Sequence, residues 1–249
     1  MKHLLRRIAR GLGIGASAPP DLPPDLDPRT VETIRAVRPY TMTSELRLAA
    51  LCDAVRHVVA SGIEGDIVEC GVWRGGSMMA VARTLLQLGT ADRQLWLFDT
   101  FEGMTEPGDA DISLHGESAS ALMRSSDRED PASVWCRATL PEVEAALRGT
   151  GYDPARMHFV QGRVEDTLPA RAPARIALLR LDTDWYESTR HELAHLYPRL
   201  SVGGVLIVDD YGHWQGARRA VDEYLEQQGA ALLLHRIDYT GRSAVKWRP

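Results

Sequence analysis

The sequence of 249 residues has only three cysteines, and Cys52, Cys70 and Cys136 are widely separated. An odd, scattered set does not form a disulfide framework, and none of the three has metal-ligand spacing, so we expect a reducing, cytoplasmic environment. Long hydrophobic runs are also missing. No window approaches the roughly 18 apolar residues that a membrane-spanning helix needs. We therefore expect no integral membrane segment.

An excess of positive charge is absent as well, because 34 acidic side chains against 29 lysines and arginines leave a net charge of −5. The chain thus lacks the electrostatic footprint of a nucleic-acid-binding protein. Its apolar fraction of 44% and charged fraction of 25% are ordinary for a globular domain. We expect one α/β domain that acts on a small molecule, without a nucleic-acid partner.

The first 29 residues differ from the rest. Residues 1–12 combine basic and apolar side chains at helical spacing, as in a membrane-surface helix or a twin-arginine signal, but the following Gly-rich stretch is too short for a signal core. Five prolines in residues 16–28 then indicate an extended linker. We interpret residues 1–29 as a frayed tail and linker, and residues 30–249 as the folded domain.

Short apolar segments alternate with amphipathic ones along this domain. The apolar segments predict strands, and the amphipathic segments, closed by Ser, Thr or Gly caps, predict helices. This alternation favours a doubly wound, Rossmann-like α/β fold with a mostly parallel seven-stranded sheet and an antiparallel edge strand. The predicted strands are 65–71, 93–100, 157–164, 175–182, 204–210, 231–238 and 243–249, and the predicted helices are 44–62, 77–89, 139–149, 188–200 and 217–229.

One region, residues 104–135, is polar and has no clear period. A connection of this length is usually either mobile or functional, as an active-site lid or substrate loop. Both interpretations stay open from the sequence.

A Gly-rich turn, "ECGVWRGGS" at residues 69–77, follows the first predicted strand. Its glycines allow a ligand to approach the backbone, but it is neither a dinucleotide nor a nucleoside-triphosphate motif. Asp99 ends the next strand, where an acid can accept hydrogen bonds from ribose hydroxyls. Glu69, Gly71 and Asp99 together predict a nucleoside-containing ligand such as S-adenosylmethionine. The alternatives are an ordinary structural turn and, for Asp99, a helix cap or solvated strand end.

Acidic residues also end two successive strands, at Asp182 and at Asp209 and Asp210. Because parallel strand ends meet at one edge of a sheet, three carboxylates can converge there, and such oxygen ligands suit Mg²⁺. Asp184 follows Asp182 by two residues and is placed to take a proton from a substrate hydroxyl. The alternative is a set of solvated loop acids and caps for the helix at Ser188.

Aromatic and histidine residues surround these acids. Tyr211, His213 and Trp214 are candidates for a substrate pocket beside Asp210. His191 and His195 have the spacing of a zinc pair, but no third ligand follows, which favours ordinary helix positions.

Six ordered motifs, from about Tyr40 to the C-terminus, resemble the macrocin-type O-methyltransferases, which methylate sugar hydroxyls of macrolide and aminocoumarin natural products. The motifs are "YTMTSELRL", "GDIVECGVWRGGSMM", "LFDTFEGM", "GRVEDTLP", "LRLDTDWYEST" and "VGGVLIVDDYGHWQGARRAVDEY". The resemblance implies a class I methyltransferase sheet, S-adenosylmethionine, and Mg²⁺ held by Asp182, Asp209 and Asp210 with Asp184 as general base. The cofactor contacts that it implies are Thr41, Met42, Glu69, Cys70, Gly71, Val72, Trp73, Arg74, Asp99, Glu165 and Asp182.

These observations favour a Mg²⁺-dependent O-methyltransferase that acts on a vicinal diol, on a deoxysugar of a glycosylated natural product. Two other classes stay open: a metal-dependent hydrolase that activates water with the same aspartates, and a non-catalytic nucleoside-binding module on the same fold. We also expect a homo-oligomer, although no motif identifies an interface.

Overall fold

The computed structural model describes residues 22–130, 133–229 and 231–248. The basic N-terminal segment therefore lies outside the described residues, as does the start of the Pro-rich linker. The first described helix is α2 (Pro28–Val37), where Asp27 accepts a hydrogen bond from the backbone N–H of Thr30 at 3.1 Å. Proline at the first helical position and aspartate at the N-cap explain why the linker ends here.

Seven strands form one sheet in the order β3-β2-β1-β4-β5-β7-β6. The first five strands of this order are parallel, whereas β7 pairs antiparallel with β5 and β6 pairs antiparallel with β7. This confirms the predicted fold class. The strand bounds are β1 Asp66–Cys70, β2 Leu95–Asp99, β3 Met157–Gln161, β4 Ile176–Leu181, β5 Leu200–Val208, β6 His235–Arg236 and β7 Arg242–Val245.

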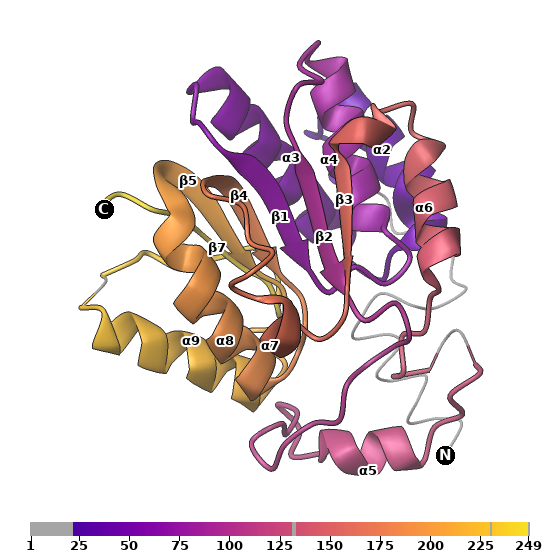
Figure 1. The fold of residues 1–249 in the computed structure, drawn as a ribbon, viewed down its shortest axis with the longest axis vertical. Coiled ribbons are helices and arrows are strands. Elements are labelled where there is room, and N and C mark those ends of the chain that lie inside the picture. The colour runs from indigo at the N-terminus through magenta and orange to yellow at the C-terminus, as the bar shows by residue number, and fades with distance from the viewer. Residues whose placement is uncertain (1–21, 131–132, 230, 249) are drawn as a thin grey trace.

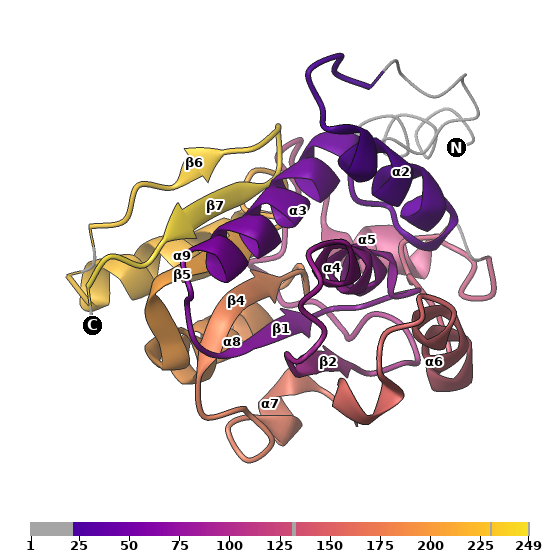
Figure 2. The ribbon, with the colours of Figure 1, turned by 90° about the horizontal axis from the view of Figure 1, so that it is seen from above.

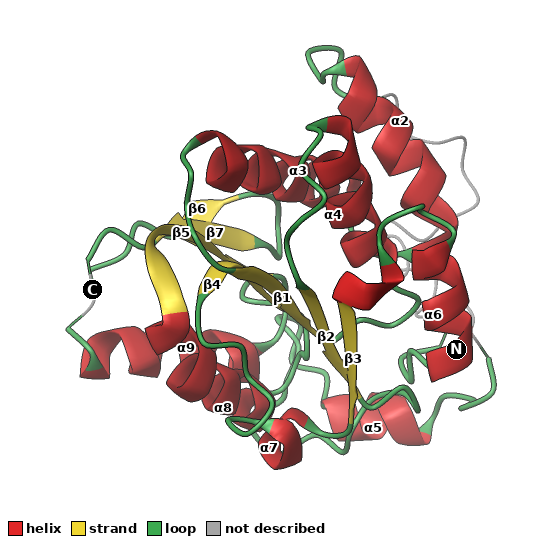
Figure 3. Cartoon of the chain, turned by 45° about the horizontal axis from the view of Figure 1, so that its top comes forward, coloured by secondary structure: helices red, strands yellow, loops and turns green. Residues whose placement is uncertain are grey.

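Helices cover both faces of the sheet (Figures 1, 2 and 3). One layer holds α2, α3 (Glu45–Ala60), α4 (Gly76–Gln87) and α6 (Leu140–Arg148), and the other holds α7 (Val164–Thr167), α8 (Tyr186–Leu196) and α9 (Gln215–Gln227). The short helix α5 (Ala119–Arg124) lies beyond the carboxyl ends of the strands (Figure 1). No helix in the described part of the chain is long and apolar enough to span a bilayer.

Two apolar cores result from alternation along the strands. Ile67 and Leu178 pack into the core under α3 and α4, while Val68 and Leu179 pack into the core under α8 and α9. Successive strand residues point to opposite faces, so the residue that follows Val68 returns to the α3 side. Glu69 is therefore directed toward α3 and not along the strand toward solvent.

Strands β1 and β4 come closest where both end. The Asp182 N–H donates to the Cys70 carbonyl at 2.8 Å, and a Cβ atom on Gly71 would overlap the carbonyl of Asp182. Gly71 also has a φ of +82°, a conformation that favours glycine. Only glycine allows the turn after β1 to cross this point.

We expect Gly71→Ala to destabilise the protein by more than about 2 kcal/mol, because a left-handed alanine costs roughly 1–2 kcal/mol and the overlap adds to that cost. Gly89→Ala is the control, since Gly89 has a φ of +69° but no heavy atom within 4 Å of the position that an alanine Cβ would take. Urea unfolding of both variants measures the difference. Equal losses would show that the close approach at Gly71 contributes nothing.

Candidate active site

A cavity of about 680 Å³ lies at the carboxyl ends of the parallel strands. This volume is in the range of small-molecule sites, and its position is where open α/β sheets bind ligands. Residues from the β1 and β4 turns, from the segment before α3 and from residues 104–135 line it together. The cavity thus joins the Gly-rich turn and the acidic strand ends in one space.

Several residues of the segment 104–135 contact the rest of the domain. Ser113 forms a β-bridge with Trp214, and the Leu114 N–H donates to the His213 carbonyl at 2.7 Å. Asp111 accepts a hydrogen bond from the Tyr186 N–H at 2.8 Å, at the start of α8. These contacts attach the first part of the segment to the domain beside the cavity. The second part, which includes α5, contributes Leu122, Met123 and Val134 to the cavity wall.

Three carboxylates meet at the cavity floor: Asp182, Asp184 and Asp210 each offer an oxygen, and these oxygens lie within 4.8 Å of one another. Burial raises the pKa of Asp182 to about 7, with Arg180 opposing the rise and Asp210 adding to it. Burial and the charges of Asp210 and Asp182 raise the pKa of Asp184 well above its usual range. The Oδ2 atom of Asp210 is buried and has no hydrogen-bond partner among the described residues. The arrangement therefore suits a bound cation.

Asp209 is not a member of this group. Its two oxygens accept hydrogen bonds from Arg47 and from Arg180, the latter at 2.6 Å, and the residue is buried. The reason is the alternation of side chains along β5, which directs the Asp209 carboxylate to the two arginines on the α3 side, although both Asp209 and Asp210 border the cavity. The sequence prediction grouped Asp209 with Asp182 and Asp210. In the structure, the third carboxylate that converges with Asp182 and Asp210 is that of Asp184. The role of Asp209 as a metal ligand stays a prediction.

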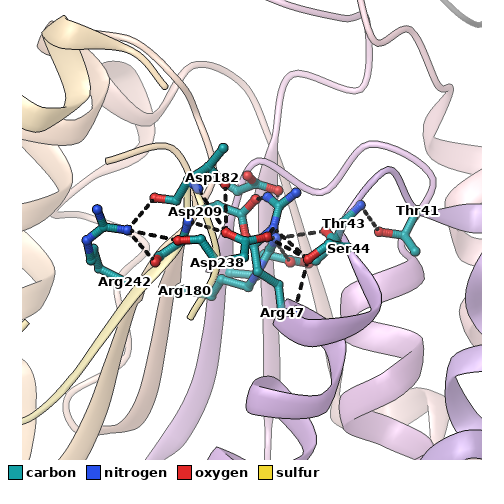
Figure 4. A network of polar contacts seen from close by, with 12 residues as sticks. Thr41, Thr43, Ser44, Arg47, Arg180, Asp182, Asp209, Asp238 and Arg242 are labelled. Atoms are coloured by element: carbon teal, nitrogen blue, oxygen red, sulfur yellow. Dashed lines mark hydrogen bonds and ion pairs between the residues drawn. The ribbon is translucent and has the colours of Figure 1, made fainter. Parts of the chain in front are cut away.

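A buried network of charges connects Asp209 to the rest of the site (Figure 4). Arg180 donates to Glu69 at 2.6 Å, to Asp182 at 2.7 Å and to the Thr43 hydroxyl at 3.0 Å. Arg180 and Glu69 are 3% and 1% exposed, so this pairing takes place away from water. Burial raises the pKa of Glu69 to about 8, and Arg180 opposes the rise. One guanidinium therefore neutralises carboxylates from β1, β4 and β5.

Eight of the residues predicted to contact the cofactor line the cavity, and three do not. Glu69 is directed to Arg180 on the α3 side of the sheet, and Cys70 is directed into the opposite core. The guanidinium of Arg74 lies 5.4 Å from the centre of the Trp73 ring and is not part of the cavity lining. Glu69, Cys70 and Arg74 thus lie outside the cavity lining, and their contacts with the cofactor stay predictions. The eight lining residues are Thr41, Met42, Gly71, Val72, Trp73, Asp99, Glu165 and Asp182.

Asp99 organises the turn after β1. Its Oδ2 accepts hydrogen bonds from the N–H groups of Val72 at 2.6 Å and Trp73 at 3.0 Å, and its Oδ1 accepts one from Phe101 at 2.7 Å. Burial raises the pKa of Asp99, and these amides oppose the rise. The carboxylate borders the cavity but is already bonded to the backbone. Its predicted contact with a ribose stays a prediction.

Some of the aromatic and histidine residues singled out in the sequence line the cavity, and others lie outside it. His213 and Trp214 line the cavity, whereas the Tyr211 hydroxyl donates to Asp222 at 2.7 Å on the α9 surface. His191 and His195 pack ring against ring with centroids 4.4 Å apart, and the described residues place no third metal ligand beside them. Trp185 lines the cavity and packs against Trp214 with centroids 5.0 Å apart.

Strained backbone is concentrated around the cavity. Trp73, Cys136 and Asp184 all line it, and their φ angles are +46°, +46° and +69°. Such conformations cost about 1–3 kcal/mol in non-glycine residues and persist where the surroundings fix them. The surrounding fold therefore has to stabilise the backbone conformation of Trp73, Cys136 and Asp184.

Sequence reasoning missed the two buried arginines. The signal for Arg180 was present, because one charged residue interrupts the apolar run "IALLRL" of a central strand. Such a residue needs a buried partner. Arg47 stands in a helix where a charged side chain is ordinary, and its partners Asp209 and Asp238 are remote in the chain.

The strand order, the Gly-rich turn after β1 and the cavity at the carboxyl ends are together those of a class I methyltransferase. The chain belongs to the macrocin O-methyltransferase (TylF) family, which matches residues 23–248. It is therefore an O-methyltransferase, and the hydrolase and the non-catalytic module that the sequence alone left open are set aside.

Relatives with stated activities are similar over most of the chain. The 8-demethyl-8-(2,3-dimethoxy-alpha-L-rhamnosyl)-tetracenomycin-C 4'-O-methyltransferase of Streptomyces olivaceus is 38% identical over 209 residues, which cover 84% of this chain and 75% of that protein. The demethyldecarbamoylnovobiocin O-methyltransferase of Streptomyces niveus is 35% identical with the same coverage, 84% and 75%. The structure of the O-methyltransferase NovP superposes with a TM-score of 0.73 at 32% identity, covering 84% of this chain and 83% of that one.

We expect Arg180→Met to cost about 3–5 kcal/mol of unfolding free energy, because it leaves several buried carboxylates without their shared cation. Arg148→Met is the control, since Arg148 pairs with Glu144 at 3.0 Å on an exposed helix surface, and such a pair contributes about 0.5 kcal/mol or less. Urea unfolding followed by tryptophan fluorescence measures both. Similar small losses in the two variants would contradict the role given to Arg180.

Proposed function

We propose that the protein transfers a methyl group from S-adenosylmethionine to a hydroxyl of a vicinal diol on a glycosylated small molecule, with Mg²⁺ bound at the carboxylates. The observation that carries this proposal is the group of Asp182, Asp184 and Asp210 in a cavity that the turn after β1 also lines. A methyl-donor site and a site for an ionisable hydroxyl thus share one space.

The methyl donor is assigned to the side of the cavity formed by the β1 turn. Gly71, Val72 and Trp73 present backbone there, Thr41 and Met42 cover it from the segment before α3, and Glu165 adds a carboxylate from α7. When bound, S-adenosylmethionine supplies an electrophilic methyl group on a sulfonium sulfur. The positive sulfonium is compatible with the acidic floor of the cavity.

Asp182 and Asp210 are the proposed Mg²⁺ ligands. Their donors are carboxylate oxygens, the type that Mg²⁺ prefers, and the unpartnered Oδ2 of Asp210 is an oxygen that a cation would satisfy. When bound, Mg²⁺ would lower the pKa of a coordinated hydroxyl and relieve the repulsion that raises the pKa of Asp184. Asp209, the third ligand proposed from the sequence, receives no direct support from a geometry in which it holds Arg47 and Arg180.

Asp184 is the proposed general base. It takes the proton of the acceptor hydroxyl as that oxygen bonds to the methyl carbon and the bond between this carbon and sulfur breaks. The described residues of the segment 104–135 that line the cavity, among them Met104, Leu122 and Met123, are proposed to limit the access of water to the reacting groups. Orientation of the two substrates by the cavity walls supplies most of the rate enhancement.

The proposed acceptor class rests on the relatives and on the cavity walls. The tetracenomycin relative is named for methylation at position 4' of a rhamnosyl compound, and a third relative, from Micromonospora griseorubida, is named mycinamicin III 3''-O-methyltransferase at 33% identity. Trp185, Trp214 and Met123 give this cavity an apolar wall against which the face of a sugar or an aglycone can pack. Incubation with labelled S-adenosylmethionine, Mg²⁺ and a panel of glycosylated compounds, followed by mass analysis, tests the proposal.

We expect Asp184→Asn to lower kcat by about a hundredfold or more, because the amide keeps the shape but cannot take a proton. KM for S-adenosylmethionine should change little, since the methyl donor is assigned to the β1 turn and not to Asp184. Asp166→Asn, an exposed substitution on α7, is the control and should retain full activity. Steady-state assays with an accepted glycoside measure these constants. An Asp184→Asn enzyme with wild-type kcat would contradict the assignment of the base.

Removal of divalent cations should abolish turnover, and added Mg²⁺ should restore it, because without a cation the three carboxylates repel one another. Asp210→Asn should require about ten times more Mg²⁺ for half-maximal activity, as a ligand loss of this kind weakens binding. Full activity in EDTA would rule out the metal. Unchanged Mg²⁺ dependence in Asp210→Asn would rule out this ligand.

A further inference from the structure

A buried acid that takes no part in the proposed reaction lies on the face of the sheet that α8 covers, opposite to the face with Glu69 and Asp209. Glu192, on α8, is 0% exposed, and its Oε1 accepts a hydrogen bond from the Thr183 hydroxyl at 3.0 Å. Its Oε2 is buried without a hydrogen-bond partner among the described residues, and Cys70 is a neighbour of the carboxyl. A buried carboxyl with one unpartnered oxygen is costly, so its position calls for a reason.

The partner of Glu192 is the residue between two of the aspartates at the cavity floor. Thr183 separates Asp182 from Asp184, and its carbonyl accepts a hydrogen bond from the Trp185 N–H at 2.8 Å. Asp184 has a φ of +69°, a conformation that an unrestrained aspartate rarely keeps. The hydrogen bond from the Thr183 hydroxyl to Glu192 thus attaches this short turn to helix α8.

Glu192 also lies next to the residue that precedes the Gly-rich turn after β1. Cys70, which borders Glu192, ends β1 and precedes Gly71, and its carbonyl accepts the Asp182 N–H at 2.8 Å. Glu192 thus contacts the last residue of β1, Cys70, and the turn after β4 at Thr183. Burial raises the pKa of Glu192 well above its usual range, which agrees with a neutral carboxyl in this apolar core.

We propose that Glu192 is a positioning residue for Asp184, which it orients through Thr183 from the opposite face of the sheet. The proposal rests on the role of Asp184 as the base in the proposed function. Glu192 touches neither substrate; it fixes the angle at which the turn presents the Asp184 carboxylate to the cavity. A misplacement of such a group by about 1 Å costs about a hundredfold in rate.

A matched set of variants separates positioning from packing. Glu192→Gln keeps an acceptor oxygen for the Thr183 hydroxyl, while Glu192→Leu keeps the bulk and removes the acceptor. Thr183→Val removes the donor and Thr183→Ser retains it. We expect Glu192→Gln and Thr183→Ser to keep kcat within about twofold, and Glu192→Leu and Thr183→Val to lose about ten- to a hundredfold in kcat with KM values within about twofold.

Two further measurements complete the test. The double variant of Thr183→Val with Glu192→Leu should be no slower than the slower single variant, because both changes remove one hydrogen bond. Hydrogen exchange of the amides of residues 182–185 should be faster in Glu192→Leu than in Glu192→Gln, a readout that does not depend on turnover. Asp184→Asn is assayed in parallel.

The outcomes distinguish the two proposals. Wild-type kcat in Glu192→Leu, or equal losses in Glu192→Gln and Glu192→Leu, would overturn the positioning role. A loss in Glu192→Leu that raises both KM values and lowers the melting temperature together with kcat would show a purely structural role and also overturn it. If Asp184→Asn is fully active, the proposed base is wrong, whereas an inactive Asp184→Asn beside a fully active Glu192→Leu removes only the inference about Glu192.

Discussion

The site depends on the burial of one guanidinium. Arg180 is inside the sheet, where a charge is costly unless every partner is in place, and its partners come from β1, β4, β5 and the segment before α3. Glu69, in β1, and Asp209, just after β5, lie on the two strands that flank β4 and would repel each other without it. Because the same guanidinium also bonds Asp182, it fixes the position of the Asp182 carboxylate relative to those of Glu69 and Asp209. The bonds that neutralise the buried charges in the core therefore also set the position of Asp182 in the site.

The sheet separates two tasks of its acidic residues. On the α3 side, Glu69 and Asp209 neutralise arginines, and of these two only Asp209 also borders the cavity. At the strand tips, Asp182, Asp184 and Asp210 each offer an oxygen to one point, although Asp182 also accepts a hydrogen bond from Arg180. Asp209 and Asp210 directly follow β5. Because consecutive side chains alternate, Asp209 pairs with arginines while Asp210 joins the carboxylates at the cavity floor.

Much of the fold was predictable from the sequence, because apolar runs and helix caps are local signals. The strands up to β5 and the helices α3, α4, α6, α8 and α9 occur where the pattern indicated. Helix α2 (Pro28–Val37) and the short helices α5 and α7 were not predicted, and β6 shrinks to His235–Arg236. The site was predictable to the level of which strand ends converge. Which way each acid points was not, since the preference of Asp209 for Arg47 is decided by a partner 162 residues away. Asp99 likewise bonds to the turn of Val72, a contact that only the assembled β1 and β2 create.

The ion pair between Arg47 and Asp238 bears on how the chain is made. These residues are 191 positions apart, and Asp238 lies in the terminal hairpin that also supplies β7 to the sheet. Contacts of such separation form late, because a long loop must close first. During synthesis the segment around Thr41–Arg47 leaves the ribosome long before Asp238 does. The electrostatic environment of Arg47 is therefore complete only once the hairpin that contains Asp238 and β7 has joined the sheet.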